Sequence, residues 1–175
     1  DVSGKGMPAA LFMGPARALL EEGMQTLRSP AEILTRLNDA ICRNNPKFMF
    51  VTVLFGIHDT TTGRTVLSRG GHPPAVLRKR DGTVSEIDAP TGRLIGIEGG
   101  ADCFADVEIT LQPGDAILLY TDGLSEAMSP EDSKQFGVKG LMRCMEGLSP
   151  TSPLDAWAAS ISRTVKSYAA SDQLD

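Results

Sequence analysis

Residues 48–57 read FMFVTVLFGI, a nearly continuous apolar run that is rich in β-branched and aromatic side chains. A run of this length and composition is typical of a strand that is covered on both faces. The turn residues at 60–63 follow it and lead into a second predicted strand at 64–68. This stretch therefore opens the β portion of the fold.

Two helices are predicted before this run. In the first, at residues 7–27, apolar and small residues recur at helical spacing: Met7, Leu11, Gly14 and Ala18. The small residues would allow close packing on that face, and Pro15 predicts a kink or a break. The second helix begins at Ser29, because Ser29 and Glu32 form a capping box and a proline stands at the first helical position. Residues 44–46 end it.

More strands and two further helices follow residue 68. The predicted strands are a hairpin at 74–80 and 83–87 around Asp81-Gly82, and a pair at 103–111 and 115–121 joined by the turn at 112–114. The predicted helices have apolar residues at three- to four-residue spacing, at 138–148 and from Ser152 to Tyr168. Because strands and helices are segregated along the chain, the order predicts an α+β fold. No internal repeat or second domain is indicated.

The composition is that of an ordinary soluble globular domain. The chain has 175 residues, of which 41% are hydrophobic and 22% charged, and its formal net charge is −5. The negative charge argues against binding to nucleic acid or to an anionic membrane surface. No apolar run approaches the roughly 18–20 residues that a membrane span needs. The three cysteines form no metal-binding or disulfide pattern, which favours a reduced, cytoplasmic protein.

Two short segments each place a carboxylate in a tight, glycine-rich turn. The first is Asp1-Val2-Ser3-Gly4-Lys5-Gly6, and the second is Asp122-Gly123, directly after a buried apolar run. Oxygen ligands held in this way suit hard ions such as Mg²⁺ or Mn²⁺. Each segment also has an ordinary structural interpretation: Asp122 as a simple turn residue, and Asp1 as part of a helix entry or a phosphate-binding nest.

Taken together, the motifs carry a resemblance that none of them shows alone. In chain order they are DVSGKGMPAALFM (1–13), FVTVLFGI (50–57), GGHPPAVL (70–77), LQPGDAILLYTDGLSEA (111–127) and FG (136–137). The set resembles the SpoIIE-like branch of the PPM metal-dependent protein serine/threonine phosphatases. It covers nearly the whole chain, and the last two helices match only in character.

The resemblance implies a set of metal ligands. It places a side-chain ligand at Asp1, a backbone carbonyl ligand at Val2 and a further carboxylate at Asp122, so that Asp1 and Asp122 are the catalytic aspartates. A C-terminal ligand falls on Asp175 in preference to Asp172. The implied cofactor is two Mn²⁺ or Mg²⁺ ions, which activate water for in-line attack on phosphorus without a covalent phospho-enzyme.

The two histidines and two other polar residues are ambiguous. His72 has a pKa range that suits a general acid, but its place among rigid turn residues favours an anchor between two strands. His58 is expected at the surface. Thr52 is expected to pack inside its strand, and Glu126 to be solvated rather than to orient a ligand.

The resemblance also implies a fold and a function. The expected fold is an α/β/β/α sandwich of two antiparallel sheets flanked by helices. The expected activity is hydrolysis of phosphoserine or phosphothreonine on a protein, usually an anti-sigma-factor antagonist in signalling or the stress response. Relatives commonly carry a sensory or regulatory domain upstream. Because the helix after Gly6 connects directly to Asp1, a shift of that helix would switch the site.

The chain departs from the family pattern at both ends. Residues 1–175 are expected to form a single domain that lacks the N-terminal strands, with their metal aspartate, and the C-terminal strand. Open sheet edges of this kind predict strand exchange or a homodimer, weak metal binding and little activity for this chain alone. Two rival functions remain open: a non-catalytic, pseudophosphatase-type binding module, and a metal-dependent phosphoesterase that acts on small molecules.

Overall fold

The computed structural model describes residues 1–4, 6–43, 45, 49–100 and 103–170, and the chain divides into two compact units. The first unit comprises Asp1–Pro74 and Asp88–Leu111, and the second comprises Ala75–Ile87 and Gln112–Asp175. The first unit contains α1 (Met7–Thr26), α2 (Pro30–Cys42), β1 (Val53–His58), β2 (Arg64–Gly70), β5 (Thr91–Gly92) and β6 (Val107–Thr110). The second unit contains β3 (Val76–Arg78), β4 (Val84–Glu86), β7 (Ala116–Leu118), α3 (Asp122–Ser125), α4 (Gly137–Glu146) and α5 (Leu154–Ala169).

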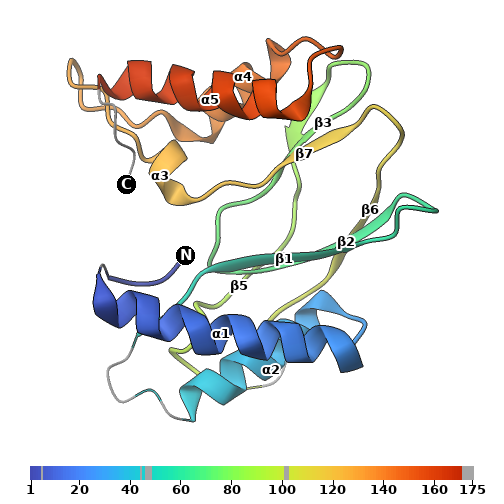
Figure 1. Cartoon of the computed structure of the whole chain (residues 1–175), viewed down its shortest axis with the longest axis vertical. Helices are drawn as coiled ribbons and strands as arrows, with labels where there is room; N and C mark the ends of the chain where they lie inside the picture. The colour runs from blue at the N-terminus through green and yellow to red at the C-terminus, as the bar shows by residue number, and fades with distance from the viewer. Residues whose placement is uncertain (5, 44, 46–48, 101–102, 171–175) are drawn as a thin grey trace. The chain divides into compact units, whose positions relative to one another are not determined.

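The sheet of the first unit is built around β2. β2 pairs antiparallel with all of β1 through residues 65–70, antiparallel with β6 and parallel with the short β5. α2 packs on β1 and β2, and α1 packs against α2, so both helices lie on the same face of this sheet (Figure 1). The core between them is apolar and includes Leu34, Leu37, Ile41, Val51, Ile95 and Phe104. Its burial supplies the main stabilisation of the unit.

The start of α2 is fixed by two acceptors. The Ser29 side chain accepts a hydrogen bond from the Glu32 N–H at 3.2 Å, as the capping box predicts. Asp106, which comes from the segment before β6, accepts from the Ser29 hydroxyl at 2.6 Å and from the Ala31 N–H at 2.7 Å. A carboxylate at this position also complements the positive end of the helix dipole.

The face of α1 that packs differs from the one the sequence suggested. Met7 and Leu11 are 75% and 70% exposed, whereas Ala16 and Gly23 are buried. A Cβ atom at Gly23 would lie 3.1 Å from the Ile33 side chain, so the small residue allows α1 and α2 to approach closely. Pro15 was predicted to kink or break the helix; the helix is continuous through it, which excludes a break.

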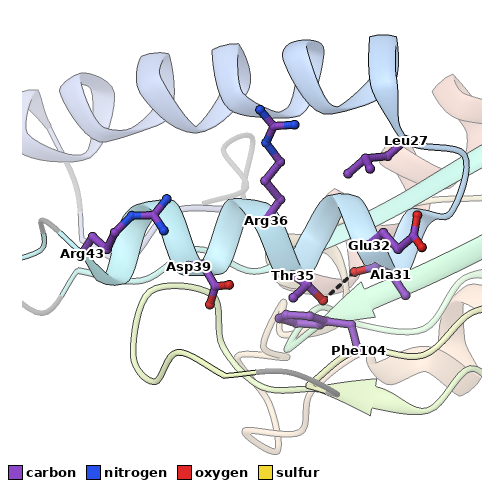
Figure 2. Close-up of a pocket in the computed structure, with 8 residues that line it drawn as sticks. All are labelled: Leu27, Ala31, Glu32, Thr35, Arg36, Asp39, Arg43 and Phe104. Atoms are coloured by element: carbon purple, nitrogen blue, oxygen red, sulfur yellow. Dashed lines mark hydrogen bonds between the residues drawn. The ribbon is translucent and has the colours of Figure 1, made fainter.

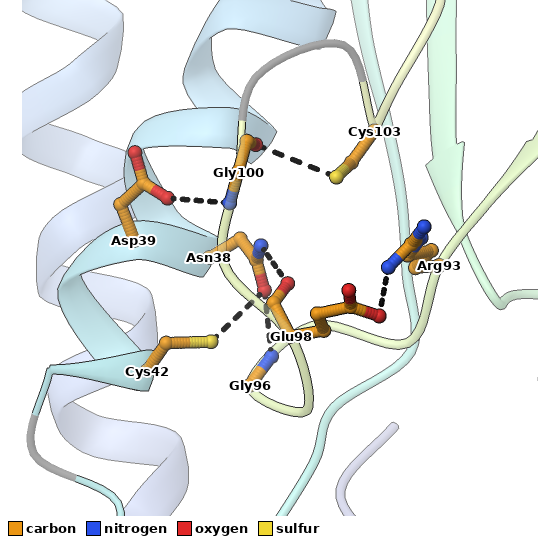
Figure 3. A network of polar contacts seen from close by, with 8 residues as sticks. All are labelled: Asn38, Asp39, Cys42, Arg93, Gly96, Glu98, Gly100 and Cys103. Atoms are coloured by element: carbon orange, nitrogen blue, oxygen red, sulfur yellow. Dashed lines mark hydrogen bonds and ion pairs between the residues drawn. The ribbon is translucent and has the colours of Figure 1, made fainter.

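A polar network ties the loop after β5 to α2 (Figure 3). Asn38 is fully buried, and its Nδ2 donates to the Glu98 carbonyl while its Oδ1 accepts from the Gly96 N–H, both at 2.8 Å. The loop residue Ile95 exchanges two backbone hydrogen bonds with Val51, at 3.0 and 3.1 Å. Asn38 therefore holds the loop on α2, and the loop holds the backbone of Val51 through Ile95.

We expect the free energy of unfolding of the Asn38→Ala variant to be about 2 kcal/mol lower than that of the wild type, since the substitution leaves the buried Gly96 N–H without its acceptor. The measurement is the free energy of unfolding from urea denaturation. Asp39→Ala is the matched control: its carboxylate accepts a long, 3.4 Å hydrogen bond from the exposed Gly100 N–H, and a change in the free energy of unfolding below about 0.5 kcal/mol is expected. Equal losses in the two variants would contradict this account of the network.

The second unit has a three-stranded antiparallel sheet in the order β4-β3-β7. α4 packs on β3 and β4, and α5 packs against α4. The residues that fill this core are Val76, Tyr120, Leu141, Met145, Trp157, Ile161 and Val165. As predicted, α4 and α5 bury residues at three- to four-residue spacing, and α5 begins at Leu154 rather than at Ser152.

The α+β class with two sheets and helices is confirmed, but several strands differ from the prediction. β1 begins at Val53 rather than residue 48, and Val51 forms only isolated bridges. β6 and β7 do not pair with each other: β6 joins β2 and β7 joins β3, although 112–115 is a turn as expected. Within the described residues, no helix is both long and apolar enough to cross a membrane.

Candidate active site

The segment Asp1–Ser3 lies antiparallel to residues 50–52 of the first unit. The Asp1 backbone nitrogen donates to the Thr52 carbonyl, and the Thr52 N–H donates to the Asp1 carbonyl, both at 2.8 Å. The Ser3 N–H donates to the Phe50 carbonyl at 2.9 Å, and the Phe50 N–H donates to the Ser3 hydroxyl at the same distance. Four hydrogen bonds therefore fix the backbone on either side of Val2.

This pairing directs the Val2 carbonyl. Because Asp1 and Thr52 exchange both of their backbone hydrogen bonds, Val2 occupies the non-hydrogen-bonded position opposite Val51. Its N–H and C=O therefore point away from residues 50–52, while its side chain is buried at 8% exposure. Asp1 is exposed. A carboxylate and an adjacent carbonyl that is not used in this pairing form an oxygen donor pair that fits Mn²⁺ or Mg²⁺.

Two glycines let the chain turn from this segment into α1. Gly4 has φ +84° and Gly6, the N-cap of α1, has φ +78°. Both values lie in the left-handed region that glycine adopts without strain. The glycines of the first motif therefore serve the sharp connection between Asp1 and the helix. Lys5 lies outside the described residues.

A cavity of about 240 Å³ lies beside the Asp1 segment. Its lining consists of Asp1, Val2, Met13, Ala16, Arg17, Leu20, Val51, Thr52, Val53, Leu54 and His72. His72 is buried at 8% exposure, and its Nδ1 lies 2.8 Å from Thr52 Oγ1, a hydrogen-bond distance. The expectation that His72 anchors a turn fits this geometry, and Thr52 has a polar contact in addition to the packing expected of it.

His58 makes a similar contact at the opposite end of β1. It is exposed, as expected, and its Nδ1 lies 2.8 Å from Thr65 Oγ1. Thr65 is itself buried at 3% exposure. The first unit therefore contains two His–Thr pairs of equal length, and Asp1 pairs with the threonine of only one of them.

Asp122 lies in the second unit and begins a short helix rather than a simple turn. α3 starts at Asp122 after the N-cap Thr121, and the Glu126 N–H donates to the Asp122 carbonyl at 2.7 Å. Asp122 and Glu126 are exposed, so the Asp122 carboxylate is accessible to a ligand, and Glu126 is solvated as expected. Tyr120, two residues before Asp122, is buried at 6% exposure and belongs to the core of this unit.

The predicted ligands that the structure describes belong to two different units. Asp1 and Val2 are adjacent in the first unit, and Asp122 is described within the second. Asp172 and Asp175 lie outside the described residues. Within the described ranges, no three or more His, Cys, Asp or Glu side chains gather closely enough to hold a metal. The metal set therefore remains a prediction.

A second cavity in the first unit, of about 520 Å³, lies along α2 (Figure 2). It is lined by Leu27, Ala31, Glu32, Thr35, Arg36, Asp39, Arg43 and Phe104. Arg36 is already paired, since its Nη2 lies 2.5 Å from Glu22 Oε1. The sequence did not indicate this cavity, because Phe104 reaches α2 from a distant part of the chain. It contains none of the predicted site residues.

Two of the cysteines have the properties of structural thiols. Burial raises the pKa of the Cys42 thiol and that of the Cys144 thiol. A thiol with a raised pKa stays protonated near neutrality and is a poor nucleophile. Cys42 also donates a 3.6 Å hydrogen bond to Asn38 Oδ1, within the network of Figure 3. These two residues therefore do not suit covalent catalysis.

Comparison with known proteins identifies the family to which this chain is similar. The family model described as "Stage II sporulation protein E (SpoIIE)" matches residues 1–175. The chain is 29% identical over 127 residues to "Phosphoserine phosphatase RsbU" of Bacillus subtilis, a match that covers 72% of this chain and 37% of that protein. The chain thus spans little more than a third of this relative.

Two solved structures share the fold. The SiaA-PP2C domain of Pseudomonas aeruginosa has a TM-score of 0.79 at 23% identity, covering 97% of this chain and 67% of that one. The phosphatase domain of the cell fate determinant SpoIIE from Bacillus subtilis, in a structure titled "Mn presoaked", has a TM-score of 0.61 at 19% identity, covering 91% and 68%. With the family model spanning every residue, the chain belongs to the SpoIIE family.

Proposed function

We propose that this chain is the catalytic part of a metal-dependent protein serine/threonine phosphatase. The observation that carries the proposal is the Asp1–Val2 segment, where an exposed carboxylate adjoins a carbonyl directed away from its strand partner. The family membership and the phosphoserine phosphatase named among its relatives support the same activity. The single-domain organisation of residues 1–175 is part of this proposal.

We assign the metal ligands to Asp1, Val2, Asp122 and Asp175. All four donors are oxygens, which favours Mn²⁺ or Mg²⁺ over zinc. Two bound ions would supply Lewis-acid activation of water and charge neutralisation on the phosphoryl oxygens. The carboxylates of Asp1 and Asp122 would hold the site, and the raised pKa values of Cys42 and Cys144 accord with a reaction that needs no covalent protein nucleophile.

The proposed substrate is phosphoserine or phosphothreonine on an anti-sigma-factor antagonist, in a cytoplasmic signalling or stress-response pathway. The support is the likeness to RsbU, which is named a phosphoserine phosphatase. Because the chain spans 37% of that relative, a sensory or regulatory domain elsewhere in the protein belongs to the same proposal. So does a homodimer, which light scattering of the purified protein would test.

The deciding experiment compares substrate classes under one set of conditions. The full natural polypeptide that carries residues 1–175 is incubated with Mn²⁺ and with a phosphoserine protein, a nucleotide or a sugar phosphate. Release of phosphate from the phosphoprotein alone is the expected result. Release from only the small molecules would replace the proposal with a small-molecule phosphoesterase, and Mn²⁺-independent binding of the phosphoprotein without release would indicate a binding module.

A further inference from the structure

We infer that His72 is a positioning residue for the Asp1–Val2 ligand pair and acts through Thr52. The inference rests on the proposed function, since it concerns the geometry of the same site. His72 itself is not assigned a metal or a proton. Its task is to hold the strand end with which Asp1 pairs.

The first link is the attachment of His72 to the sheet. Arg69 lies in β2, and its Nη1 donates to the His72 carbonyl at 3.1 Å while its Nε donates to the Ala89 carbonyl at 2.8 Å. The His72 backbone is therefore tied to a paired strand of the first unit. With its side chain almost fully buried, the imidazole has little freedom to move.

The second link is Thr52, which connects His72 to Asp1. Its Oγ1 lies 2.8 Å from His72 Nδ1, and its backbone N–H and C=O both bond to Asp1 at 2.8 Å. Thr52 stands just before β1, where the isolated bridges at Val51 have not yet become a continuous ladder. A side-chain contact at this place therefore adds a restraint that regular strand pairing does not supply.

The third observation is the cavity of about 240 Å³ that Asp1, Thr52 and His72 line together. The three residues therefore border one space, and the contact between His72 and Thr52 lies directly beside the Asp1 segment. Outer-shell partners of this kind commonly change metal affinity by about 10–100-fold when they are removed.

The test measures the Mn²⁺ affinity of the full natural polypeptide that carries residues 1–175 by calorimetry, with no substrate present. Both His72→Ala and Thr52→Val are expected to bind Mn²⁺ about 10-fold more weakly than the wild type. The double variant should be no weaker than either single variant, because both changes remove the same contact. Valine keeps the β-branched shape of threonine, so Thr52→Val preserves the strand even if His72→Ala fails to fold.

Two further variants separate positioning from a merely structural role. His72→Asn places an amide atom near the position of Nδ1 and should recover most of the Mn²⁺ affinity. The matched controls His58→Ala and Thr65→Val remove the equivalent 2.8 Å contact at the other end of β1 and should leave the affinity unchanged. Hydrogen exchange at the Thr52 amide should accelerate in His72→Ala and not in His58→Ala.

Mn²⁺ affinity that is unchanged in His72→Ala and Thr52→Val would overturn the inference, as would equal losses in the His58 and Thr65 controls. Failure of the proposed function is seen separately. In that case the wild type itself would show no Mn²⁺ binding, or Asp122→Asn would bind Mn²⁺ as tightly as the wild type.

Discussion

The Asp122→Asn variant is expected to release phosphate in the presence of Mn²⁺ about 100-fold more slowly than the wild type, or slower still. Removing a residue that only supports a metal ligand costs about 10–100-fold, and removing a direct ligand should cost at least the upper end of that range. Asp122 is an exposed residue at the start of α3, and the proposal makes its carboxylate a direct metal ligand. Asparagine has nearly the same size but no charge, so the fold of the short helix should survive. The measurement is the rate of phosphate release from a phosphoserine protein as Mn²⁺ is titrated.

The control must account for the charge that Asp122 places at a helix N-terminus. Asp155 occupies the equivalent first turn of α5 and is exposed, so Asp155→Asn removes a carboxylate of the same kind from the same unit. Asp155→Asn is expected to keep full activity. Equal losses in the two variants would show that helix stability, rather than metal binding, explains the effect of Asp122.

The second large effect concerns Arg78, which is buried at 4% exposure in the second unit. Its Nε donates to the Met145 carbonyl at 2.9 Å and its Nη2 donates to the Leu148 carbonyl at 3.2 Å, so it caps the C-terminal end of α4. Its guanidinium also lies 5.1 Å from the centroid of the Trp157 ring. We expect Arg78→Ala to lower the free energy of unfolding by about 3 kcal/mol, because two charge-assisted hydrogen bonds are lost together.

Urea denaturation followed by the fluorescence of Trp157, the only tryptophan of the chain, measures this loss. Arg78→Met is the informative companion. Within the described residues, Nη1 of Arg78 has no hydrogen-bond partner, and a buried cation that is not fully paired can be replaced by an apolar side chain at lower cost. Arg78→Met should therefore unfold less easily than Arg78→Ala. A loss below about 0.5 kcal/mol in Arg78→Ala would contradict the capping role.

The sequence predicted the helices well because their signals are local. The Ser29 cap and the spacing of apolar residues placed α2, α4 and α5 close to their observed bounds. The packing face of α1 was wrong, since the small residues that matter are those next to α2, such as Gly23 against Ile33. Which side of a helix meets its neighbour depends on tertiary contacts.

The predicted hairpin at 74–80 and 83–87 is confirmed, since β3 and β4 pair antiparallel. The sequence did not reveal the partners of the next two strands. The segments at 107–110 and 116–118 follow one another in sequence, yet they join the partners β2 and β3 in different sheets. A turn signal at 112–114 cannot reveal this, because it describes only the local backbone. β5 has two residues and leaves no periodic pattern to recognise.

The sequence motifs gave candidate residues for the site, but not the contacts between segments that are distant in the chain. The Asp1 and Asp122 motifs identify two candidate carboxylates, and their role as metal ligands stays a prediction. The pairing of Asp1 with Thr52 joins segments about fifty residues apart and could not be inferred from either motif. The role of His72 was open because a glycine-rich turn is compatible with an anchor or an acid. The structure adds the contact with Thr52 that the sequence does not contain.

The most direct test of the central claim is phosphate release from a phosphoserine protein by the full natural polypeptide, measured with added Mn²⁺ and again after chelation with EDTA. The account predicts release that requires Mn²⁺, stops with EDTA and returns when the ion is restored. Release that persists in EDTA, or its absence at saturating Mn²⁺, would contradict the assignment of this chain as a metal-dependent protein phosphatase.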